Sequence, residues 1–204
     1  MTISYSQGKP FLDLIGKEKA SDVKIALIEN TSDVYPEEKK DWVYAGRDSI
    51  TSQGFQVDVV DLQEYLEGKK LLLYRLQQAD VIWLGGGNTY YLRWILKETK
   101  ADIIIQRLVR QGKVYGGGSA GAIVAGPTLK YFENADDPKK APQKIDEGLA
   151  LTSTVAIPHW GNEKYGTVMK IAKQKLEKSG YNTVAISDEQ ALVIHESGQQ
   201  TILS

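Results

Sequence analysis

The chain contains no cysteine and only two histidines among its 204 residues. The first absence excludes disulfides, thiolate zinc sites and cysteine nucleophiles. The second argues against a metal centre built from histidines. An excess of one charge is missing as well, because 25 Lys and Arg stand against 26 Asp and Glu, for a net charge of −1. We therefore expect no metal, no cofactor and no nucleic-acid partner.

Long apolar runs are also missing. No run approaches the ~20 residues that a membrane helix needs, and residues 1–14 lack the basic start and apolar stretch of a signal peptide. The 42% hydrophobic and 25% charged residues are ordinary for a globular domain. We predict a single domain over residues 1–204, cytoplasmic and without a membrane partner.

Short apolar runs alternate with longer amphipathic segments in the first part of the chain. The strand-like runs are residues 23–30, 55–62, 80–88 and 113–118, and the helix-like segments are 37–54, 67–79 and 89–112. This βαβ rhythm predicts an α/β fold with a parallel sheet and helices on both faces. In such sheets the ligand site lies at the carboxyl ends of the strands.

The pattern loosens after the fourth strand. The later segments are a charged loop at 131–142, a β-like run at 149–160, a helix at 163–180 and two strands near the end of the chain. We expect the two last strands at the edge of the sheet, and exposed edge strands leave a homodimer open.

Residues 117–121, with the sequence GGSAG, fit the G-x-S-x-G pattern of a nucleophile elbow and directly follow a predicted strand. Glycines suit a sharp strand-to-helix turn, because they avoid clashes where strained backbone lifts a hydroxyl clear. The amide of Ala120 would then stabilise an oxyanion at the start of the next helix. We predict Ser119 as a nucleophile.

A serine hydroxyl is a poor nucleophile until a base accepts its proton. His159 ends an apolar strand-like run and follows a proline, which places it on the same rim as Ser119. His195 lies inside a late strand, where a structural or surface role is the simpler interpretation. We predict His159 as the base.

A carboxylate should orient the imidazole and stabilise its charged form. The loop between the serine and the histidine supplies Glu133, Asp136 and Asp137. Each is also typical of a solvated acidic loop, and spacing alone does not choose among the three.

A second glycine run, GGGNTYYL at residues 85–92, also falls at a strand end. It lacks the third glycine of a dinucleotide-binding motif and the lysine of a P-loop. A bare backbone amide that helps to bind an oxyanion is the better interpretation. Asn88 would cap the next helix or bind substrate.

Three segments together, VIWLGGGNTYYL, GGSAGAIVAGPT and IPHW, resemble the peptidase E family of serine peptidases, family S51. That family includes aspartyl dipeptidases and, more distantly, cyanophycinases. The resemblance spans about residues 23–195 and implies a class I glutamine amidotransferase-like fold, a flavodoxin-like, doubly wound three-layer sandwich. It implies Ser119 as nucleophile, His159 as base, and the amides of Gly87 and Ala120 as the oxyanion hole.

The resemblance also bears on the acid. In the dipeptidases the acid precedes a residue and then a proline, and the sequence DDP carries this pattern onto Asp136. Counting back from the histidine by the family's interval gives Asp137 instead. Asp136 is preferred, and Glu133 stays open.

One departure from the family concerns specificity. The aspartyl dipeptidases carry an arginine shortly after the histidine, which pairs with the substrate's aspartate, whereas alignment puts Val168 at that position. The nearby basic residues are Lys164, Lys170 and Lys173, and lysine lacks the planar bidentate fork of arginine. A strict preference for N-terminal aspartate is therefore not expected.

These observations predict a serine peptidase that hydrolyses short peptides through a Ser-His-Asp/Glu triad. Two alternatives stay open. One is an esterase or amidase that uses the same elbow, and the other is a non-catalytic binding or regulatory protein on the same scaffold.

Overall fold

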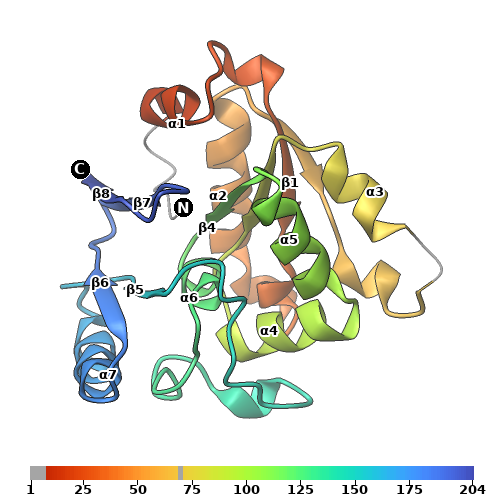
Figure 1. The fold of residues 1–204 in the computed structure, drawn as a ribbon. Coiled ribbons are helices and arrows are strands. Elements are labelled where there is room, and N and C mark those ends of the chain that lie inside the picture. Colours follow the sequence, from red (N-terminus) through yellow and green to blue (C-terminus); the bar gives the residue numbers. More distant parts are fainter. Residues whose placement is uncertain (1–7, 69–70) are drawn as a thin grey trace.

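Four parallel strands form the central sheet of the computed structural model, which describes residues 8–68 and 71–204 (Figure 1). In the order β2-β1-β3-β4 they are Gln56–Val59, Lys24–Ile28, Val81–Leu84 and Val114–Gly117. Each neighbouring pair is parallel. The predicted α/β fold with a parallel sheet is thereby confirmed.

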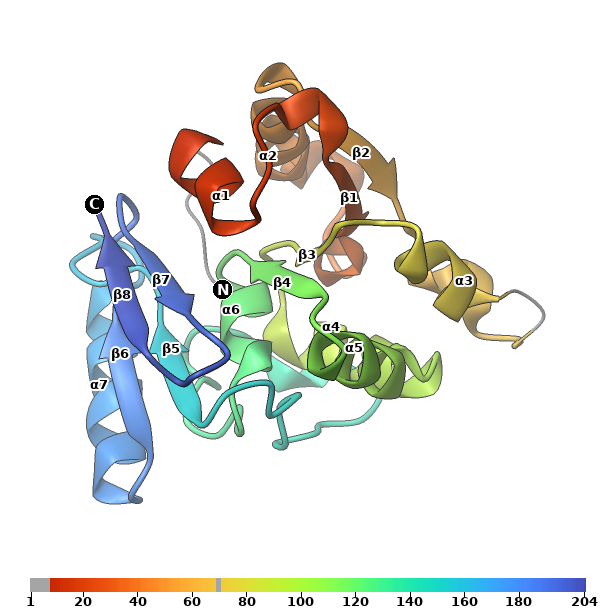
Figure 2. The same cartoon turned by 45° about the horizontal axis from the view of Figure 1, so that its top comes forward.

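Helices cover both faces of this sheet, as Figure 2 shows. One face carries α1 (Gly8–Leu14) and α2 (Asp41–Ser52), and the segment of α1 had not been predicted as a helix. The other face carries four helices: α3 (Leu72–Gln77), α4 (Thr89–Glu98), α5 (Ala101–Arg110) and α6 (Ala120–Ala125). The result is a three-layer sandwich.

The two faces follow from the alternation of side chains along each strand. In β1, Ile25 and Leu27 pack in the cluster that includes α1 and α2, whereas Ala26 and Ile28 pack in the cluster on the opposite face. All four side chains are buried. Because both faces are covered, the strand reads as an unbroken apolar run.

The last third of the chain builds two further small sheets beside β4 (Figure 1). The first pairs β5 (Thr154–Ile157) with β6 (Asn182–Ala185) in parallel across helix α7 (Gly166–Lys178). The second is the antiparallel hairpin of β7 (Ala191–Ile194) and β8 (Gln200–Leu203).

The prediction that the last two strands lie at the edge of the central sheet is wrong. Within the described residues, β5 pairs with β6 and β7 pairs with β8, and none of them pairs with β4. The reason is helix α6, which contacts both β4 and β5 and packs its Ala122 against Ala156, Ile186 and Leu192. The helix thus joins the late strands to the sheet through side chains instead of a hydrogen-bond ladder.

The helices also differ in detail from the segments predicted from the sequence. The helical segment 89–112 divides at Lys100, whose left-handed backbone (φ 59°) separates α4 from α5. In the part of the chain that the structure describes, five short 3-10 helices connect the elements: η1 (Ala20–Asp22), η2 (Asn30–Ser32), η3 (Glu37–Lys39), η4 (Leu62–Tyr65) and η5 (Pro138–Lys140). Across the described ranges, no helix combines the length and apolar character needed to cross a membrane.

Candidate active site

The register of the strands brings the predicted serine and histidine to one rim. Gly117 pairs with Leu84 at the end of β4, and Ser119 follows two residues later. At the end of β5, Ile157 pairs with Ala185 of β6, and His159 again follows two residues later. Both side chains therefore leave the carboxyl ends of parallel strands, where α/β folds place their ligands.

Ser119 occupies a strained turn between β4 and α6. Its backbone has φ 49° and ψ −108°, outside the common regions for a residue with a side chain. Tight packing holds it there. A Cβ on Gly121 would lie 2.1 Å from the Leu84 carbonyl oxygen, and one on Gly117 would lie 2.5 Å from the Gly121 backbone. The two flanking glycines of the elbow are thus required by close backbone approach.

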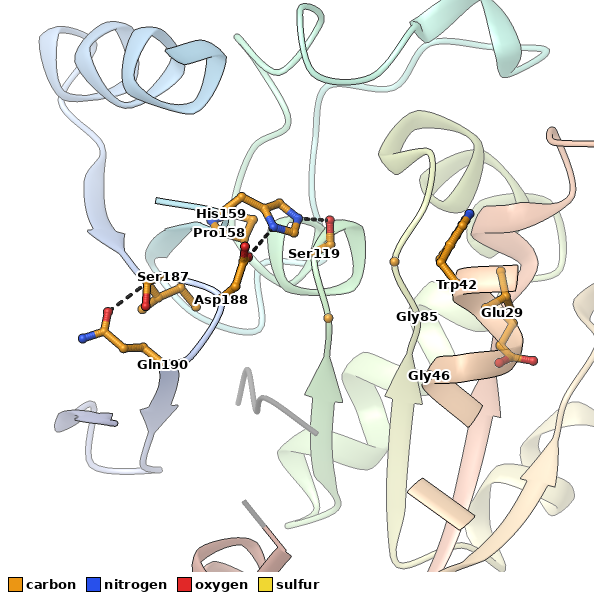
Figure 3. A pocket seen from close by; sticks show the side chains of 14 residues that line it. Glu29, Trp42, Gly46, Gly85, Ser119, Pro158, His159, Ser187, Asp188 and Gln190 are labelled. Carbon is orange, nitrogen blue, oxygen red and sulfur yellow. Dashed lines mark hydrogen bonds and ion pairs between the residues drawn. The ribbon is translucent and has the colours of Figure 1, made fainter. Parts of the chain in front are cut away.

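The imidazole of His159 meets the hydroxyl of Ser119, with 2.8 Å between Nε2 and Oγ (Figure 3). His159 also has a left-handed backbone, at φ 58°, so both residues of the pair hold strained conformations of the kind that gather at functional sites. The ring of Tyr165 packs against the imidazole, with centroids 5.1 Å apart and planes at 31°. This contact limits how far the imidazole can swing.

The carboxylate on the other side of the imidazole belongs to Asp188, in the segment between β6 and β7. Its Oδ1 lies 2.6 Å from His159 Nδ1, and its Oδ2 accepts a hydrogen bond of 2.7 Å from Asn162 Nδ2. Desolvation raises the pKa of Asp188, but the hydrogen bonds from Asn162 and His159 outweigh it and hold the pKa below its usual value. The Asp188 carboxylate is therefore ionised at neutral pH.

Asn162 is itself fixed by the turn after the histidine. Its Oδ1 accepts hydrogen bonds from the backbone amides of Lys164 (2.9 Å) and Tyr165 (3.1 Å). The backbone amide of Asn162 donates to the His159 carbonyl (3.1 Å). The tetrapeptide that begins at the histidine thus carries both the imidazole and the group that orients its carboxylate.

Asp136, the acid preferred from the sequence, lies elsewhere. Its Oδ2 accepts hydrogen bonds from the amide (3.0 Å) and the hydroxyl (2.5 Å) of Thr89, at the start of α4. Burial raises its pKa, although the Thr89 hydrogen bonds and the nearby His159 act in the opposite direction. The expectation that Asp136 contacts the imidazole is corrected: the structure gives that position to Asp188.

The two other acids considered from the sequence are also engaged away from the imidazole. Glu133 pairs with Lys144 (2.8 Å between Oε1 and Nζ), and the Asp137 carboxylate caps η5 by accepting from the Lys139 amide (2.9 Å). The whole loop is tied to the start of α4, because Asn88 donates to the Asp137 carbonyl (3.0 Å).

The second glycine run forms the turn between β3 and α4. Asn88 is fully buried and caps α4, accepting from the Tyr91 amide (2.9 Å), so its side chain serves the helix. Gly87 has φ 134°, and a Cβ there would lie 2.6 Å from the Thr31 carbonyl oxygen. Among the hydrogen bonds of the described ranges, none has the amide of Gly86, Gly87 or Ala120 as its donor.

A pocket of about 250 Å³ opens beside Ser119 (Figure 3). Gly85 and Gly86 from the turn after β3, and Gly118 from the elbow, form its floor with bare backbone. The remaining walls come from α2 and from the segment after β6, together with Glu29 and Pro158. Its side-chain lining is Glu29, Trp42, Val43, Ser119, Pro158, His159, Ile186, Ser187, Asp188 and Gln190.

The other histidine lies apart from this pocket. His195 follows β7 and lines a separate cavity of about 630 Å³ together with Arg110 and Lys113. Within residues 8–68 and 71–204, no three His, Asp or Glu side chains are grouped as a metal site would require.

The fold and the elbow at the rim of its sheet are those of a serine peptidase. The chain belongs to peptidase family S51, whose sequence profile matches residues 8–202. It is 32% identical to the uncharacterized peptidase Lmo0363 of Listeria monocytogenes over 160 residues, 78% of this chain and 76% of that protein. It is 35% identical to peptidase E of Nostoc over 109 residues, 53% of this chain and 41% of that protein.

Solved structures agree with this assignment. The fold superposes on a crystal structure of a peptidase E candidate from Listeria monocytogenes with a TM-score of 0.85 and 26% sequence identity. The match covers 99% of this chain and 96% of that one. The resemblance to the peptidase E family noted from the sequence is thereby confirmed.

Asp188 is the site residue that the sequence analysis did not identify. The signal available was its position as the last residue of the late strand that the sequence predicts over residues 182–188. Had β6 been recognised as the parallel neighbour of β5, the shared rim would have placed Asp188 beside His159. The acidic loop between Ser119 and His159 instead offered three carboxylates closer in sequence.

Proposed function

We propose that the protein hydrolyses short peptides, dipeptides among them, with Ser119, His159 and Asp188 as its catalytic triad. The observation that carries the proposal is the unbroken chain of two hydrogen bonds, 2.8 Å from Ser119 to His159 and 2.6 Å from His159 to Asp188. A serine, an imidazole and an ionised carboxylate in this order are the working parts of acyl transfer.

The reaction follows from these contacts. Ser119 Oγ attacks the carbonyl carbon of the peptide bond while His159 Nε2 takes its proton. Asp188 stabilises the imidazolium and keeps Nε2 directed at the serine. The imidazolium then gives its proton to the leaving amine, which departs and leaves an ester on Ser119. Water, deprotonated by the same imidazole, hydrolyses that ester and restores the hydroxyl.

Backbone amides at the rim supply the oxyanion site in this proposal. Ala120 is the first residue of α6, and its amide has no helical acceptor. The Thr31 hydroxyl donates to the Gly86 carbonyl, and in a trans peptide the next amide points the opposite way. The Gly87 amide is therefore directed away from Thr31, which supports its predicted part in the oxyanion hole together with Ala120.

The test is hydrolysis of a dipeptide panel by Ser119→Ala beside the parent. We expect kcat/KM to fall by about 10⁴ to 10⁶, because without its serine the catalytic triad has no nucleophile. The far-ultraviolet circular dichroism spectrum and the Tm should stay close to those of the parent. Ser197→Ala, in the exposed turn before β8, is the matched control and should keep parental rates. Parental rates in Ser119→Ala would refute the triad.

Ester substrates with the same acyl group belong in the same assay. A protein that cleaves esters but no peptide in the panel would be an esterase on this elbow. A protein that binds peptides and cleaves neither class would have a binding role instead.

A further inference from the structure

We propose that the pocket beside Ser119 receives the side chain of the residue that supplies the scissile carbonyl, and that it selects an uncharged aliphatic side chain over an acidic one. This inference rests on the proposed function and names its substrate class. Three features of the pocket support it: the side of Ser119 on which it lies, its mostly apolar walls and the charges of its lining.

The position of the imidazole decides which half of the substrate enters the pocket. His159 must protonate the leaving amine, so the leaving group lies on the imidazole side of Ser119. Figure 3 shows His159 on one side of Ser119 and Gly85, Trp42 and Glu29 on the other. The acyl part of the substrate, including its side chain, therefore extends toward α2.

The surface that meets this side chain is mostly apolar. Helix α2 presents Trp42, Val43 and Gly46, and Gly46 shares a face with the other two because it follows Trp42 by four residues and Val43 by three. Pro158 and Ile186 add further apolar surface to the lining. Trp42 leaves 44% of its surface exposed beside the serine, so an aliphatic side chain that covers it would remove apolar area from water.

Apart from His159, the ionisable side chains that line the pocket are carboxylates. Among residues 8–68 and 71–204, no lysine or arginine lines the pocket, and the carboxylates that do are Glu29 and Asp188. Arg47 is held on Glu29, donating to its Oε2 from Nη2 and from Nε (3.1 Å). A substrate carboxylate would lose its water shell beside two like charges without gaining a cation.

A basic side chain gains little from the same two carboxylates. Glu29 already accepts from Arg47, and its side chain is only 11% exposed. Asp188 already accepts from His159 and Asn162. A lysine in the pocket would have to displace one of these partners, so a neutral side chain fits best.

Substrate selection tests this directly. We would measure kcat/KM for four dipeptides that share a C-terminal leucine and begin with leucine, alanine, aspartate or lysine. We expect the leucyl substrate to exceed the aspartyl and lysyl substrates by at least about tenfold, the range that pocket contacts typically give. An aspartyl or lysyl substrate cleaved as fast as the leucyl one would overturn the proposal.

A variant of the pocket sharpens the test. Gly46→Leu adds a large side chain to the part of the lining that α2 supplies, and leucine is a better helix former than glycine, so α2 should be retained. We expect the ratio of leucyl to alanyl kcat/KM to fall at least about tenfold. Ala45→Leu adds the same side chain at the neighbouring, exposed position of α2 and should leave the ratio unchanged. An unchanged ratio in Gly46→Leu would overturn the assignment of the pocket.

A fluorophosphonate probe separates this proposal from the proposed function. Failure of the probe to label Ser119, with no peptide cleaved, would refute the triad itself. Labelling and peptide cleavage without the leucyl preference would refute only the pocket assignment.

Discussion

The segments 133–137 and 186–190 each bring an aspartate near the imidazole, and the two aspartates are held in opposite ways. Asp136 is bound to the start of α4 through Thr89, and burial raises its pKa. Asp188 is bound to His159 and Asn162, and its pKa is lowered. A carboxylate that orients a catalytic imidazole must be ionised and in contact with it, and only Asp188 meets both conditions.

The difference shows how position in the fold outweighs position in the chain. Asp136 lies between the serine and the histidine in sequence, yet its loop is fastened to the helix after β3. Asp188 follows the histidine by 29 residues, yet it leaves the strand next to the one that carries the histidine. Neighbouring parallel strands, and not sequence order, decide which groups meet at the rim.

The largest expected difference is in kcat between the Asp188→Asn and Asp136→Asn variants. Asp188→Asn should lower kcat by about 10⁴, because an amide no longer holds the imidazole in the tautomer that accepts the serine proton. Asp136→Asn keeps an acceptor for Thr89 and should cost less than about tenfold. Steady-state hydrolysis of one good peptide substrate measures both. A larger loss in Asp136→Asn than in Asp188→Asn would reverse the assignment.

Asn162 is a positioning residue in this account, and its effect should be smaller. Asn162→Ala removes the hydrogen bond to the Asp188 carboxylate, worth about 1.5–3 kcal/mol, together with the two that Asn162 accepts from the amides of Lys164 and Tyr165. It should lower kcat about ten- to hundredfold with little change in KM. Asn134→Ala, in an exposed loop, is the control. A change in KM alone would show that Asn162 acts on substrate binding instead.

The pKa values of Asp188 and Asp136 are shifted in opposite directions, and this difference should change how the free energy of unfolding depends on pH. We expect this effect to be the smallest of those predicted. Between the lowered pKa of Asp188 and the ordinary value of 3.8, the unfolded chain binds more protons, so ionised Asp188 stabilises the fold as pH rises. Between 3.8 and the raised pKa of Asp136, the folded chain binds more, so ionised Asp136 destabilises it.

Thermal melts between pH 3 and pH 6 can resolve these two slopes. Relative to the parent, Asp188→Asn should lose Tm as pH rises, and Asp136→Asn should gain it. The changes should be about 1–3 °C in each variant, smaller for Asp188 because it is partly exposed. Slopes of the same sign in both variants would contradict the assigned environments.

Much of the fold could be read from the sequence, because strands buried on both faces appear as short apolar runs between amphipathic helices. The elbow was also readable, since only glycines fit where Gly117 and Gly121 meet neighbouring backbone. The pairing of β5 with β6 was not, because two short apolar runs carry no record of which strand each will join. Asp188 was missed for the same reason.

The sequence predicted one property of the pocket, its specificity, but not the residues that line it. The absence of the family's arginine indicated that a strict preference for N-terminal aspartate is not expected. The walls could not be foreseen, because Trp42 on α2 and Ile186 after β6 are 144 positions apart and meet only through the packing of α2 and the late strands around the rim.

In this account His159 Nδ1 donates a hydrogen bond to the Asp188 carboxylate. Nuclear magnetic resonance of ¹⁵N-histidine-labelled protein observes the proton of that hydrogen bond directly. With two histidines in the chain, His195→Gln leaves a single imidazole to assign. The account predicts a strongly downfield Nδ1 proton that persists in Asp136→Asn and disappears in Asp188→Asn. A signal that survives Asp188→Asn and is lost in Asp136→Asn would contradict it.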